Sequence, residues 1–580
     1  MNKLKTLILL VIFMAGLSVQ AQTDDPLYAL PSANSPTQNS STIALSANGR
    51  RVAMANMLNN TVSIVNLSTN EVLAEIPVGD DPRTVDFAVD DSLLLTVNRG
   101  DGTLSVIDVE AQSVIATYPV GVLPYGVIDR DDQTAFVALQ GTDEVIEIDF
   151  TTGEILARMS TPDSPMGLAL WGDFLYVSHL WSGELSLIYL PQMRVVRTIQ
   201  TGIDSSLSPS VVVDPRDGLL YLPQSRSNAQ NENLTFDTTI FPVVNVVDLE
   251  NLGVQRLDRL TVDTADRPVN MPFDLAVDTV RDWVFVVNAG SNNISILNRA
   301  TGLAEANIRV GSNPRGIRLS LDNNFAYIHN AIEGSLTIIN TRTLSIVDVL
   351  PISDLRIPVD ELIGAELFHT AADPRIAANW ISCASCHFDG QSDGRVWLDF
   401  PGGARNTPAL FDLQETAPYN WSATWDELAD VELKIRELQV GRGLLNGTSN
   451  TALGNPHTEL SLDLDILAGY LLTFTPPATP ESSDAELVAR GAEVFASLDC
   501  ASCHAGTSTV DGLSHDVGTG GEFNTPTLHW LWLSQPYFHD GRAETLWDVF
   551  VLPGEHQLVA DVPLEDIDAL VAYLMSISLP

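Results

Sequence analysis

The stretch Thr61-Val-Ser-Ile-Val65 alternates apolar and polar residues with the period of two that is typical of a half-buried strand. Short apolar segments of this kind, usually ending in Asp or Asn, recur along residues 40–350. They are Val62–Asn66, Leu104–Asp108, Val145–Asp149, Leu185–Tyr189, Val244–Asp248, Ile294–Asn298 and Leu336–Asn340, with end-to-end spacings of 42, 41, 40, 59, 50 and 42 residues. Four short strands in about 40–45 residues are typical of one propeller blade, so the seven repeats predict an all-β, seven-bladed β-propeller over residues 40–352.

Turn signals and two irregular segments add detail to this propeller. A Gly-x-x-Pro turn recurs at Gly79–Pro82, Gly121–Pro124 and Gly311–Pro314. The whole pattern resembles the YVTN-type bacterial β-propeller family, which implies a fold rather than a function. The segment Ser41–Asn56 has the pattern of an outer strand, so we expect it to close the ring against the last blade. The polar insertion near Ser225–Pro242 is interpreted as a solvated loop, with a docking loop as the alternative.

Charge and the N-terminus limit the partners and the location. The 580 residues include 74 acidic and 30 basic side chains, a formal net charge of −44. Nucleic acid is therefore not an expected partner, because a binder must neutralise phosphates with Lys and Arg. Lys3, Lys5, the apolar run Leu7–Leu17 and the small residues before Ala21 form a signal-peptide pattern over residues 1–21. We expect export to the periplasm and no membrane span, since no apolar run is long enough to cross a bilayer.

The only four cysteines lie in two identical strings, Cys383-Ala-Ser-Cys-His387 and Cys500-Ala-Ser-Cys-His504. This is the attachment pattern of haem c, in which Cys383, Cys386, Cys500 and Cys503 form thioethers and the following His becomes the proximal iron ligand. A zinc site would need Cys pairs about 15–20 residues apart, whereas these lie 117 residues apart. A redox disulfide would not require the two histidines. The sequence therefore predicts two covalently bound haem c groups.

Residues 359–580 contain a second internal repeat. Its paired segments are Gly364–Phe368 with Gly491–Phe495, Asn406–Leu410 with Asn524–Leu528, Pro418–Trp421 with Pro536–His539, and Asp463–Phe474 with Asp566–Ile577. In each half the haem-attachment string follows the first of these segments. The Pro-rich stretch Thr475–Ser483 is the expected linker between the halves.

These paired motifs, together with Pro536-Tyr-Phe-His-Asp-Gly541, resemble the bacterial dihaem cytochrome c peroxidase and MauG superfamily across residues 359–580. The resemblance implies two mainly α-helical cytochrome c-type haem domains, at residues 359–475 and 484–580. It also implies a peroxidatic haem, a second haem that stores or relays an electron, and a Trp between them. Trp421 falls at that position, with plain core packing as the alternative. A calcium ion at the domain interface is a further implied cofactor.

The sixth ligand of each iron decides what each haem does. An ungapped alignment of the halves from Pro418 and Pro536 sets Leu438 against His556. Near this place the family's second half supplies a distal ligand, so we expect His556 to ligate the second haem. The alternatives are that His539 ligates instead or that His556 is an ordinary surface residue.

The first haem is expected to keep an open site, because no His occurs between His387 and His457. In the family a Glu in the loop aligned with Glu437 moves the proton that peroxide cleavage requires. Glu432 and Gln439 take this place if the alignment slips, and Glu437 is otherwise a surface carboxylate. His457 as a cap on the first iron is the remaining alternative.

The resulting expectation is a periplasmic peroxidase-like oxidoreductase that works through a high-valent haem. It would reduce hydrogen peroxide or oxidise a protein partner, with the propeller as docking module. The partner is expected to be a small redox protein or protein substrate, basic in charge, because an acidic surface steers cations toward it. A non-catalytic dihaem electron carrier and a dihaem oxygenase that uses dioxygen are the alternatives.

Overall fold

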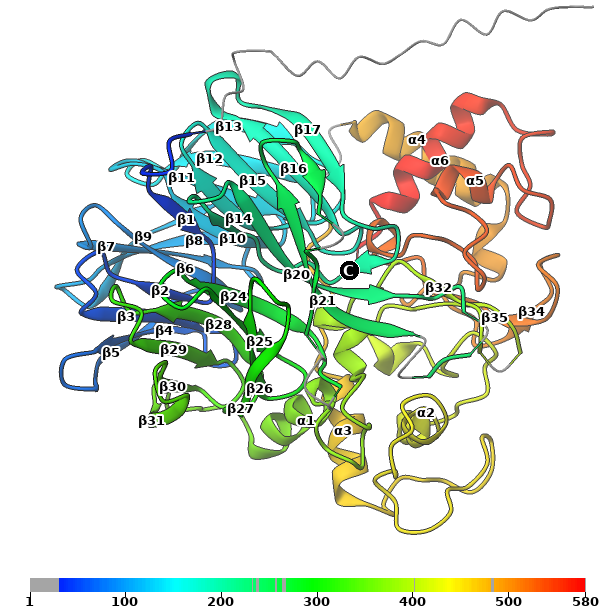
Figure 1. Cartoon of the computed structure of the whole chain (residues 1–580). Helices are drawn as coiled ribbons and strands as arrows, with labels where there is room; N and C mark the ends of the chain where they lie inside the picture. Colours follow the sequence, from blue (N-terminus) through cyan, green and yellow to red (C-terminus); the bar gives the residue numbers. More distant parts are fainter. Residues whose placement is uncertain are drawn as a thin grey trace, which may run out of the picture.

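The computed structural model describes residues 31–231, 233–235, 239–255, 258–262, 268–400, 402–480 and 484–578. The expected signal peptide, residues 1–21, lies outside this range. Seven antiparallel sheets follow one another along the chain, and they are arranged as the blades of a propeller beside a C-terminal region that carries the helices (Figure 1). The predicted seven-bladed β-propeller is therefore confirmed.

Each blade is built from consecutive strands. Blade 1 contains β2 (Ile43–Leu45), β3 (Arg51–Asn56), β4 (Thr61–Asn66) and β5 (Glu71–Pro77); blade 2 contains β6 (Pro82–Ala88), β7 (Leu93–Asn98), β8 (Thr103–Asp108) and β9 (Ser113–Pro119); blade 3 contains β10 (Pro124–Asp129), β11 (Thr134–Leu139), β12 (Glu144–Asp149) and β13 (Glu154–Ser160). Blade 4 contains β14 (Pro165–Trp171), β15 (Phe174–His179), β16 (Glu184–Tyr189) and β17 (Arg194–Gln200).

Blade 5 is irregular and holds the polar insertion. It contains β18 (Ser205–Ser206), β19 (Val212–Asp214), β20 (Leu219–Ser227), β21 (Ile240–Asp248), β22 (Gly253–Val254) and β23 (Leu260–Thr261). Blade 6 contains β24 (Pro272–Asp278), β25 (Trp283–Asn288), β26 (Asn293–Asn298) and β27 (Ala304–Arg309), and blade 7 contains β28 (Pro314–Leu319), β29 (Phe325–Asn330), β30 (Ser335–Asn340) and β31 (Ser345–Pro351).

The ring closes against the last blade as expected, but the closing segment is not an outer strand. Residues 41–56 contain β2 and β3, which are the first two strands of blade 1. Ile43 and Met54 of these strands share an apolar cluster with Tyr327 of blade 7. Blade 7 has four strands of its own, so it needs none from the start of the chain. Alternating residues reveal a strand without telling an inner position from an outer one. Within the described residues, the preceding strand β1 (Thr37–Asn39) pairs with β14 of blade 4.

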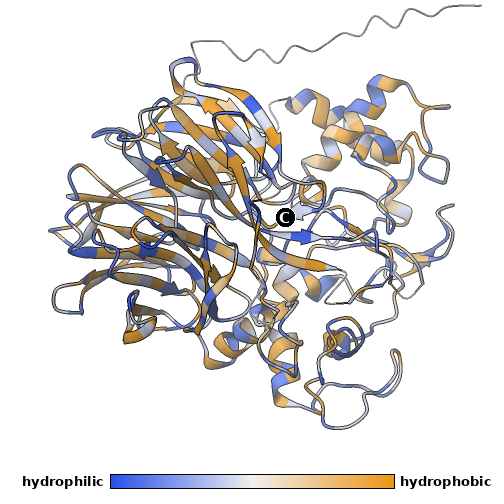
Figure 2. Cartoon of the chain, viewed as in Figure 1, coloured by the Kyte–Doolittle hydropathy of each residue, from blue (hydrophilic) through white to orange (hydrophobic). Residues whose placement is uncertain are grey.

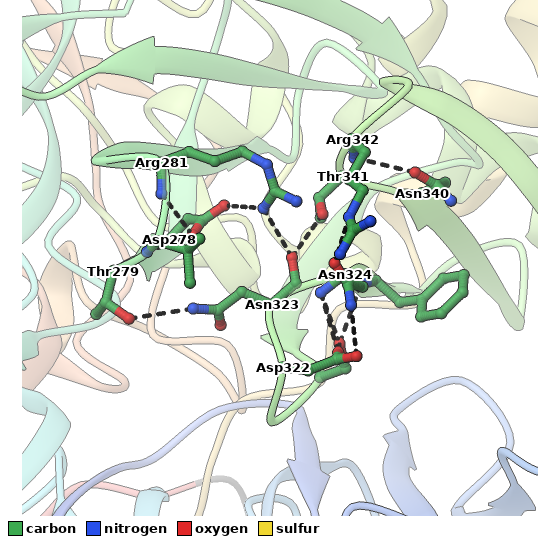
Figure 3. Close-up of polar contacts among 12 residues, drawn as sticks. Asp278, Thr279, Arg281, Asp322, Asn323, Asn324, Asn340, Thr341 and Arg342 are labelled. Atoms are coloured by element: carbon green, nitrogen blue, oxygen red, sulfur yellow. Dashed lines mark hydrogen bonds and ion pairs between the residues drawn. The ribbon is translucent and has the colours of Figure 1, made fainter.

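Side-chain hydrogen bonds join neighbouring blades. Between blades 1 and 7, the Ser63 hydroxyl donates to the carbonyl of Ile352 at 2.6 Å, and His329 Nδ1 lies 2.9 Å from Thr42 Oγ1. Between blades 6 and 7, Arg281 donates to the carbonyl of Asn323 at 2.9 Å, while Asp278 of its own turn accepts from it at 2.6 Å (Figure 3). Such bonds link neighbouring blades, which are separate sheets with no strand in common.

The C-terminal region is less helical than expected. Its helices are α1 (Val359–His369), α2 (Val431–Glu437), α3 (Leu462–Leu471), α4 (Ala485–Ser497), α5 (Leu546–Val549) and α6 (Leu564–Met575), and turns and irregular loops form much of the rest. The strand pairs β32 (Val396–Trp397) with β33 (Arg405–Asn406), and β34 (Ser514–His515) with β35 (Phe523–Asn524), are short. None of the helices in the described residues is long and apolar enough to cross a membrane.

The repeat appears in the structure as two equivalent helix pairs. Helix α1 crosses α3, and helix α4 crosses α6. A Cβ atom added at Gly364 would collide with Tyr470, and one added at Gly491 would collide with the carbonyl of Ala569. The repeated Gly-Ala-Glu segment thus places a glycine where two helices meet closely.

The first of these helix pairs shares its core with the propeller. One apolar cluster contains Phe368, Trp380 and Phe388 from the C-terminal region together with Met166 and Phe273 from the blades. Figure 2 shows apolar residues along the propeller strands and on the adjoining helices. The second helix pair has a separate cluster, formed by residues between 494 and 577.

Candidate haem-attachment sites

Both Cys-Ala-Ser-Cys-His strings fold into the same local turn. The turns η3 (Cys383–Ser385) and η7 (Cys500–Ser502) are single 3-10 turns that follow α1 and α4. In each, the main-chain N–H of the final His donates to the carbonyl of the first Cys, at 2.9 Å for His387 and 3.0 Å for His504. This geometry brings two thiols and one imidazole to a single turn of chain.

The ring environments of the two proximal histidines also match. Burial lowers the pKa of His387 to about 4, while the carbonyl of Pro408 acts in the opposite direction. Burial and the nearby His556 lower the pKa of His504, and the carbonyls of Thr509 and Pro526 oppose this shift. The repeated Asn-Thr-Pro motif therefore supplies a carbonyl toward each imidazole. A neutral imidazole is the form that ligates a metal.

The four cysteines are available for haem attachment. None of them is joined in a disulfide, and all are partly buried. Gln439 Nε2 lies 3.5 Å from Cys383 Sγ. Unpaired thiols in two identical turns, each followed by a neutral imidazole, fit the chemistry of haem c at both places.

A second imidazole faces His504 in the second half. The ring centroids of His504 and His556 lie 6.5 Å apart. A metal ion binds imidazole nitrogen at about 2.0 Å, so two rings on either side of one iron have centroids about 6 Å apart. Burial lowers the pKa of His556, and its Nδ1 atom is buried without a hydrogen-bond partner. The spacing fits an iron held between these two histidines.

Glu437, the predicted acid–base residue of the first half, lies on the surface. Glu437 is exposed at the end of α2, where it raises the pKa of Lys434 against the larger effect of burial. The buried carboxylate of this helix is Glu432, which accepts from Arg436 at 2.6 Å and from the N–H groups of Leu444 and Leu445. The acid–base role of Glu437 stays a prediction, whereas the carboxylate of Glu432 holds Arg436 and the loop that follows α2.

His457, the alternative ligand of the first iron, lies in a position that suits metal binding. His457 is fully buried, its Nδ1 lies 2.8 Å from Asp430 Oδ1, and its Nε2 has no hydrogen-bond partner. His457 lies in the loop between α2 and α3, and His556 lies in the equivalent loop between α5 and α6. A carboxylate that orients an imidazole is a common arrangement around metal-ligating histidines. The ungapped alignment missed this equivalence.

The two halves meet through a reciprocal set of contacts. The N–H of Asn406 donates to the carbonyl of His539 at 2.6 Å, and the N–H of Asn524 donates to the carbonyl of Trp421 at 2.9 Å. The side chain of Asn406 donates to the carbonyl of Pro536, and that of Asn524 donates to the carbonyl of Pro418. The predicted match of Trp421 with His539 is thus supported by equivalent bonds.

Trp421 itself lies at this interface between the halves. Its indole N–H donates to the carbonyl of Asn406 at 2.8 Å, and its ring meets the His539 ring edge-on at 6.5 Å. His539 in turn stacks on Phe523 at 3.6 Å between centroids. An unbroken series of aromatic rings therefore runs from one half into the other.

The propeller forms one wall of the first site. Asp389, two residues after His387, lies against three propeller arginines, Arg83, Arg99 and Arg315. Burial opposes ionisation of this carboxyl, but the three guanidinium groups outweigh it and lower its pKa to about 2. The adjacent Phe388 packs 6.0 Å from Phe273, between ring centroids. The propeller face that presents these residues is covered by the chain's own haem-attachment loop.

The polar insertion of blade 5 also contacts the C-terminal region. The N–H of Leu398 donates to the carbonyl of Ala229 at 3.1 Å, and the N–H of Leu234 donates to Asp399 at 3.2 Å. The prediction of a freely solvated loop is therefore wrong for this part of the insertion, because its main chain meets a second segment of the same chain.

Metal-competent side chains gather in two groups in the described residues, and both groups include residues already described. One group is Cys503, Asp511 and His515, and the other is Glu427, Asp430 and His457. Each group lies within one half. The calcium ion expected at the interface between the halves therefore stays a prediction.

Comparisons with known proteins agree with the motif analysis. No family model matches the chain. The chain is 27% identical over 282 residues to "Cytochrome c peroxidase Ccp" of Escherichia coli (strain K12), covering 37% of this chain and 57% of that protein. It is 26% identical over 229 residues to "Hydrazine synthase subunit gamma" of Kuenenia stuttgartiensis, covering 29% and 62%. The chain thus spans about three-fifths of the curated relatives that it matches.

Solved structures give weaker matches. The hydrazine synthase of Kuenenia stuttgartiensis has a TM-score of 0.48 at 19% identity, over 57% of this chain and 99% of that one. The dihydro-haem d1 dehydrogenase NirN has a TM-score of 0.37 at 17% identity, over 54% and 66%.

The resemblance to cytochrome c peroxidases is confirmed by the curated match, which indicates a haem-related oxidoreductase. The MauG branch stays a prediction.

Proposed function

We propose that the chain is a periplasmic dihaem c-type oxidoreductase that takes electrons from a small redox protein and reduces hydrogen peroxide. In this proposal residues 40–352 are the propeller, residues 359–475 hold the first haem and residues 484–580 hold the second. Oxidation of a protein partner in the manner of MauG, and use of dioxygen in place of peroxide, are variants of the same chemistry.

The observation that carries this proposal is the pair of equivalent Cys-Ala-Ser-Cys-His turns joined by a rigid interface. Asn406 and Asn524 hold the halves together from both sides, and Trp421 lies between them. A carrier with a single haem has no use for such an arrangement, whereas a two-site oxidoreductase needs a fixed route between its sites.

The residues of the second half fit an electron-transfer role. Haem c supplies one-electron chemistry and, where an axial position is open, a place for peroxide to bind. His504 and His556 would both ligate the iron of the second haem, as their 6.5 Å separation allows. Two protein ligands would leave no place for a substrate there, and Trp421 would relay electrons to the first half.

The electron donor is proposed to be a basic protein that binds away from the propeller face described above. The formal charge of −44 favours a cationic partner. The propeller was predicted to be the docking module, but the face around Arg83, Arg315 and Phe273 is covered by Phe388 and Asp389. A docking surface, if it belongs to the propeller, must lie elsewhere on it.

A specific observation favours a second candidate, a non-catalytic dihaem electron carrier. His457 is buried, oriented by Asp430 and unpartnered at Nε2, in the loop equivalent to that of His556. If His457 closes the first iron, neither haem has an open position for peroxide.

Electron paramagnetic resonance of the oxidised holoprotein separates the two candidates. The peroxidase proposal expects one high-spin and one low-spin haem, together with peroxide-dependent oxidation of a reduced basic cytochrome. His556→Ala should then convert the low-spin haem to high spin. Two low-spin haems in the parent, one of which becomes high-spin in His457→Ala, would establish the electron carrier instead.

A further inference from the structure

A buried group of arginines connects the propeller to the first haem-attachment loop. Arg83 Nη1 lies 3.1 Å from Asp389 Oδ1, Arg99 Nε lies 3.8 Å from Oδ2, and Arg315 Nη1 lies 4.0 Å from Oδ1. The exposed fractions of these side chains are 6%, 10% and 1% for the arginines and 5% for Asp389. We call these four residues the arginine clamp.

The clamp comes from separate parts of the chain. Arg83 lies at the start of β6 and Arg99 directly follows β7, both in blade 2, whereas Arg315 lies at the start of β28 in blade 7. Asp389 lies two residues after His387 and has a positive φ of 53°. The guanidinium of Arg315 also lies 5.3 Å from the Phe388 ring centroid, so the loop is held by charge and by aromatic contact.

The clamp carries more positive than negative charge. Three guanidinium groups face two carboxylates, Asp389 and Asp81, with Arg83 at 2.7 Å and Arg99 at 3.3 Å from Asp81. Several donor atoms have no hydrogen-bond partner, namely Arg83 Nε, Arg99 Nη2 and both terminal nitrogens of Arg315. Positive charge is thus incompletely compensated in an interior where water screens little.

The field of these arginines reaches the helices that support the first attachment turn. Burial lowers the pKa of His369 in α1 to about 3; Arg315 and Arg83 lower it further, and Asp389 acts in the opposite direction. Burial raises the pKa of Tyr470 in α3; Arg315 opposes that shift and Asp389 adds to it. The second half has no counterpart of Asp389, because Gly506 stands two residues after His504.

We propose that the arginine clamp makes the propeller part of the first haem site and raises the reduction potential of that haem above the value the haem would have without the clamp. A nearby uncompensated positive charge disfavours the ferric state, which carries one more positive charge than the ferrous state. Arg83, Arg99 and Arg315 act here as positioning and field-setting residues and not as catalytic ones. The inference rests on the proposed haem at Cys383, Cys386 and His387.

The test is a spectroelectrochemical titration of both haems in the full-length holoprotein. Arg315→Gln removes a positive charge, so the first haem should become harder to reduce, by roughly tenfold in its reduced-to-oxidised ratio at fixed applied potential, which equals 59 mV for one electron. Asp389→Asn removes a negative charge and should shift the ratio the opposite way. The second haem should not move in either variant.

The matched control is Arg342→Gln. Arg342 is exposed and donates to Asn324 at 2.7 Å (Figure 3). It follows the end of β30, and the antiparallel pairing of β28, β29 and β30 places it at the opposite end of blade 7 from Arg315. It removes the same charge and should shift neither potential. If Arg315→Gln fails to fold, Arg99→Gln replaces it as the variant expected to lower the reduction potential of the first haem. If Asp389→Asn fails to fold, Asp81→Asn replaces it as the variant expected to raise that potential.

Opposite shifts support the clamp as an electrostatic device. Shifts of the same sign would mean that the variants only loosen the loop, and no shift would mean that the charges do not reach the iron; both overturn the inference. Potentials are measured whether or not peroxide is turned over, so loss of the peroxidase proposal alone leaves this result readable. A protein with no haem on Cys383 and Cys386 overturns both.

Discussion

The two halves of residues 359–580 share their motifs but not their surroundings. In the first half, Phe368, Trp380 and Phe388 belong to a core that continues into the propeller. In the second half, Leu546, Phe550 and Leu570 belong to a core of that half alone. One attachment motif therefore folds either as part of a large shared interior or as a small separate unit. The local turn is the same in both, so the difference lies in what covers it.

Removal of the propeller should produce the largest difference between the two halves. In a fragment of residues 359–580 the first half loses the blades that cover Phe388 and Trp380, whereas the second half keeps its core. We expect mass spectrometry after expression with a haem-maturation system to show one haem, on Cys500 and Cys503. Limited proteolysis should digest the first half preferentially. A fragment that carries two haems and resists proteolysis would show that the first half folds on its own.

One core substitution in each half should separate the two cores. Each should lower the free energy of unfolding by about 3–5 kcal/mol, the usual cost of truncating a buried Phe to Ala. Phe388→Ala should destabilise the propeller together with the first half, because its ring contacts Phe273 of blade 6. Phe550→Ala should destabilise the second half and leave the propeller transition in place. Denaturant unfolding followed by far-ultraviolet circular dichroism for the strands and by haem absorbance measures the two separately. Equal effects of both variants on the propeller transition would contradict a separate second core.

Acid should destabilise the propeller, and with it the first half, whose core continues into the blades. Burial, and to a lesser extent Arg315, lowers the pKa of His329 in β29 to about 3. The folded chain thus keeps His329 neutral while the unfolded chain, with a pKa of about 6.5, takes up a proton. Its stabilising contribution is complete above about pH 6.5 and is lost as the pH falls toward 3.

His329→Asn gives this pH effect a measurable size. Between pH 7.5 and pH 5, the loss of unfolding free energy should be smaller than in the parent by about 2 kcal/mol, since each pKa unit corresponds to about 1.4 kcal/mol. Asparagine keeps an acceptor near Thr42 Oγ1. An unchanged pH dependence of propeller unfolding in the variant would show that His329 is not the titrating group.

The smallest expected effect belongs to Glu437. Because Glu437 is exposed at the end of α2, Glu437→Gln should leave the rate of reaction with peroxide within a factor of about two of the parent. Stopped-flow haem absorbance measures this rate. A loss of 10²–10⁴, the usual range for removal of a general acid–base group, would restore the role predicted from the sequence.

Local periodicity was sufficient to predict the blades, because each strand reports its own burial through alternating residues. The two Cys-Ala-Ser-Cys-His strings were equally readable, since their chemistry is confined to five consecutive residues. The outer position given to residues 41–56 was wrong, because the residue pattern of β2 and β3 is the same for an inner and an outer strand. The arginine clamp was out of reach, since Arg83 and Asp389 are 306 residues apart.

The distal residues of the first half show a different limit. The ungapped alignment held at Trp421 and His539, where equivalent hydrogen bonds tie the halves together. It failed beyond α2, because the loop at residues 438–461 is longer than its counterpart at residues 550–563. Loops accept insertions at little cost, so spacing is lost there before it is lost in helices. His457 was therefore compared with the wrong position.

The two-way bonds of Asn406 and Asn524 bear on how the molecule moves. Hinged enzymes separate their parts by changing a few main-chain torsions at one joint. Here each half holds main-chain carbonyls of the other, so opening the interface would strand hydrogen-bonding groups on both sides at once. These bonds oppose opening of the interface. If the halves exchange electrons as proposed, the exchange does not wait for domain closure, and its rate should not respond to solvent viscosity.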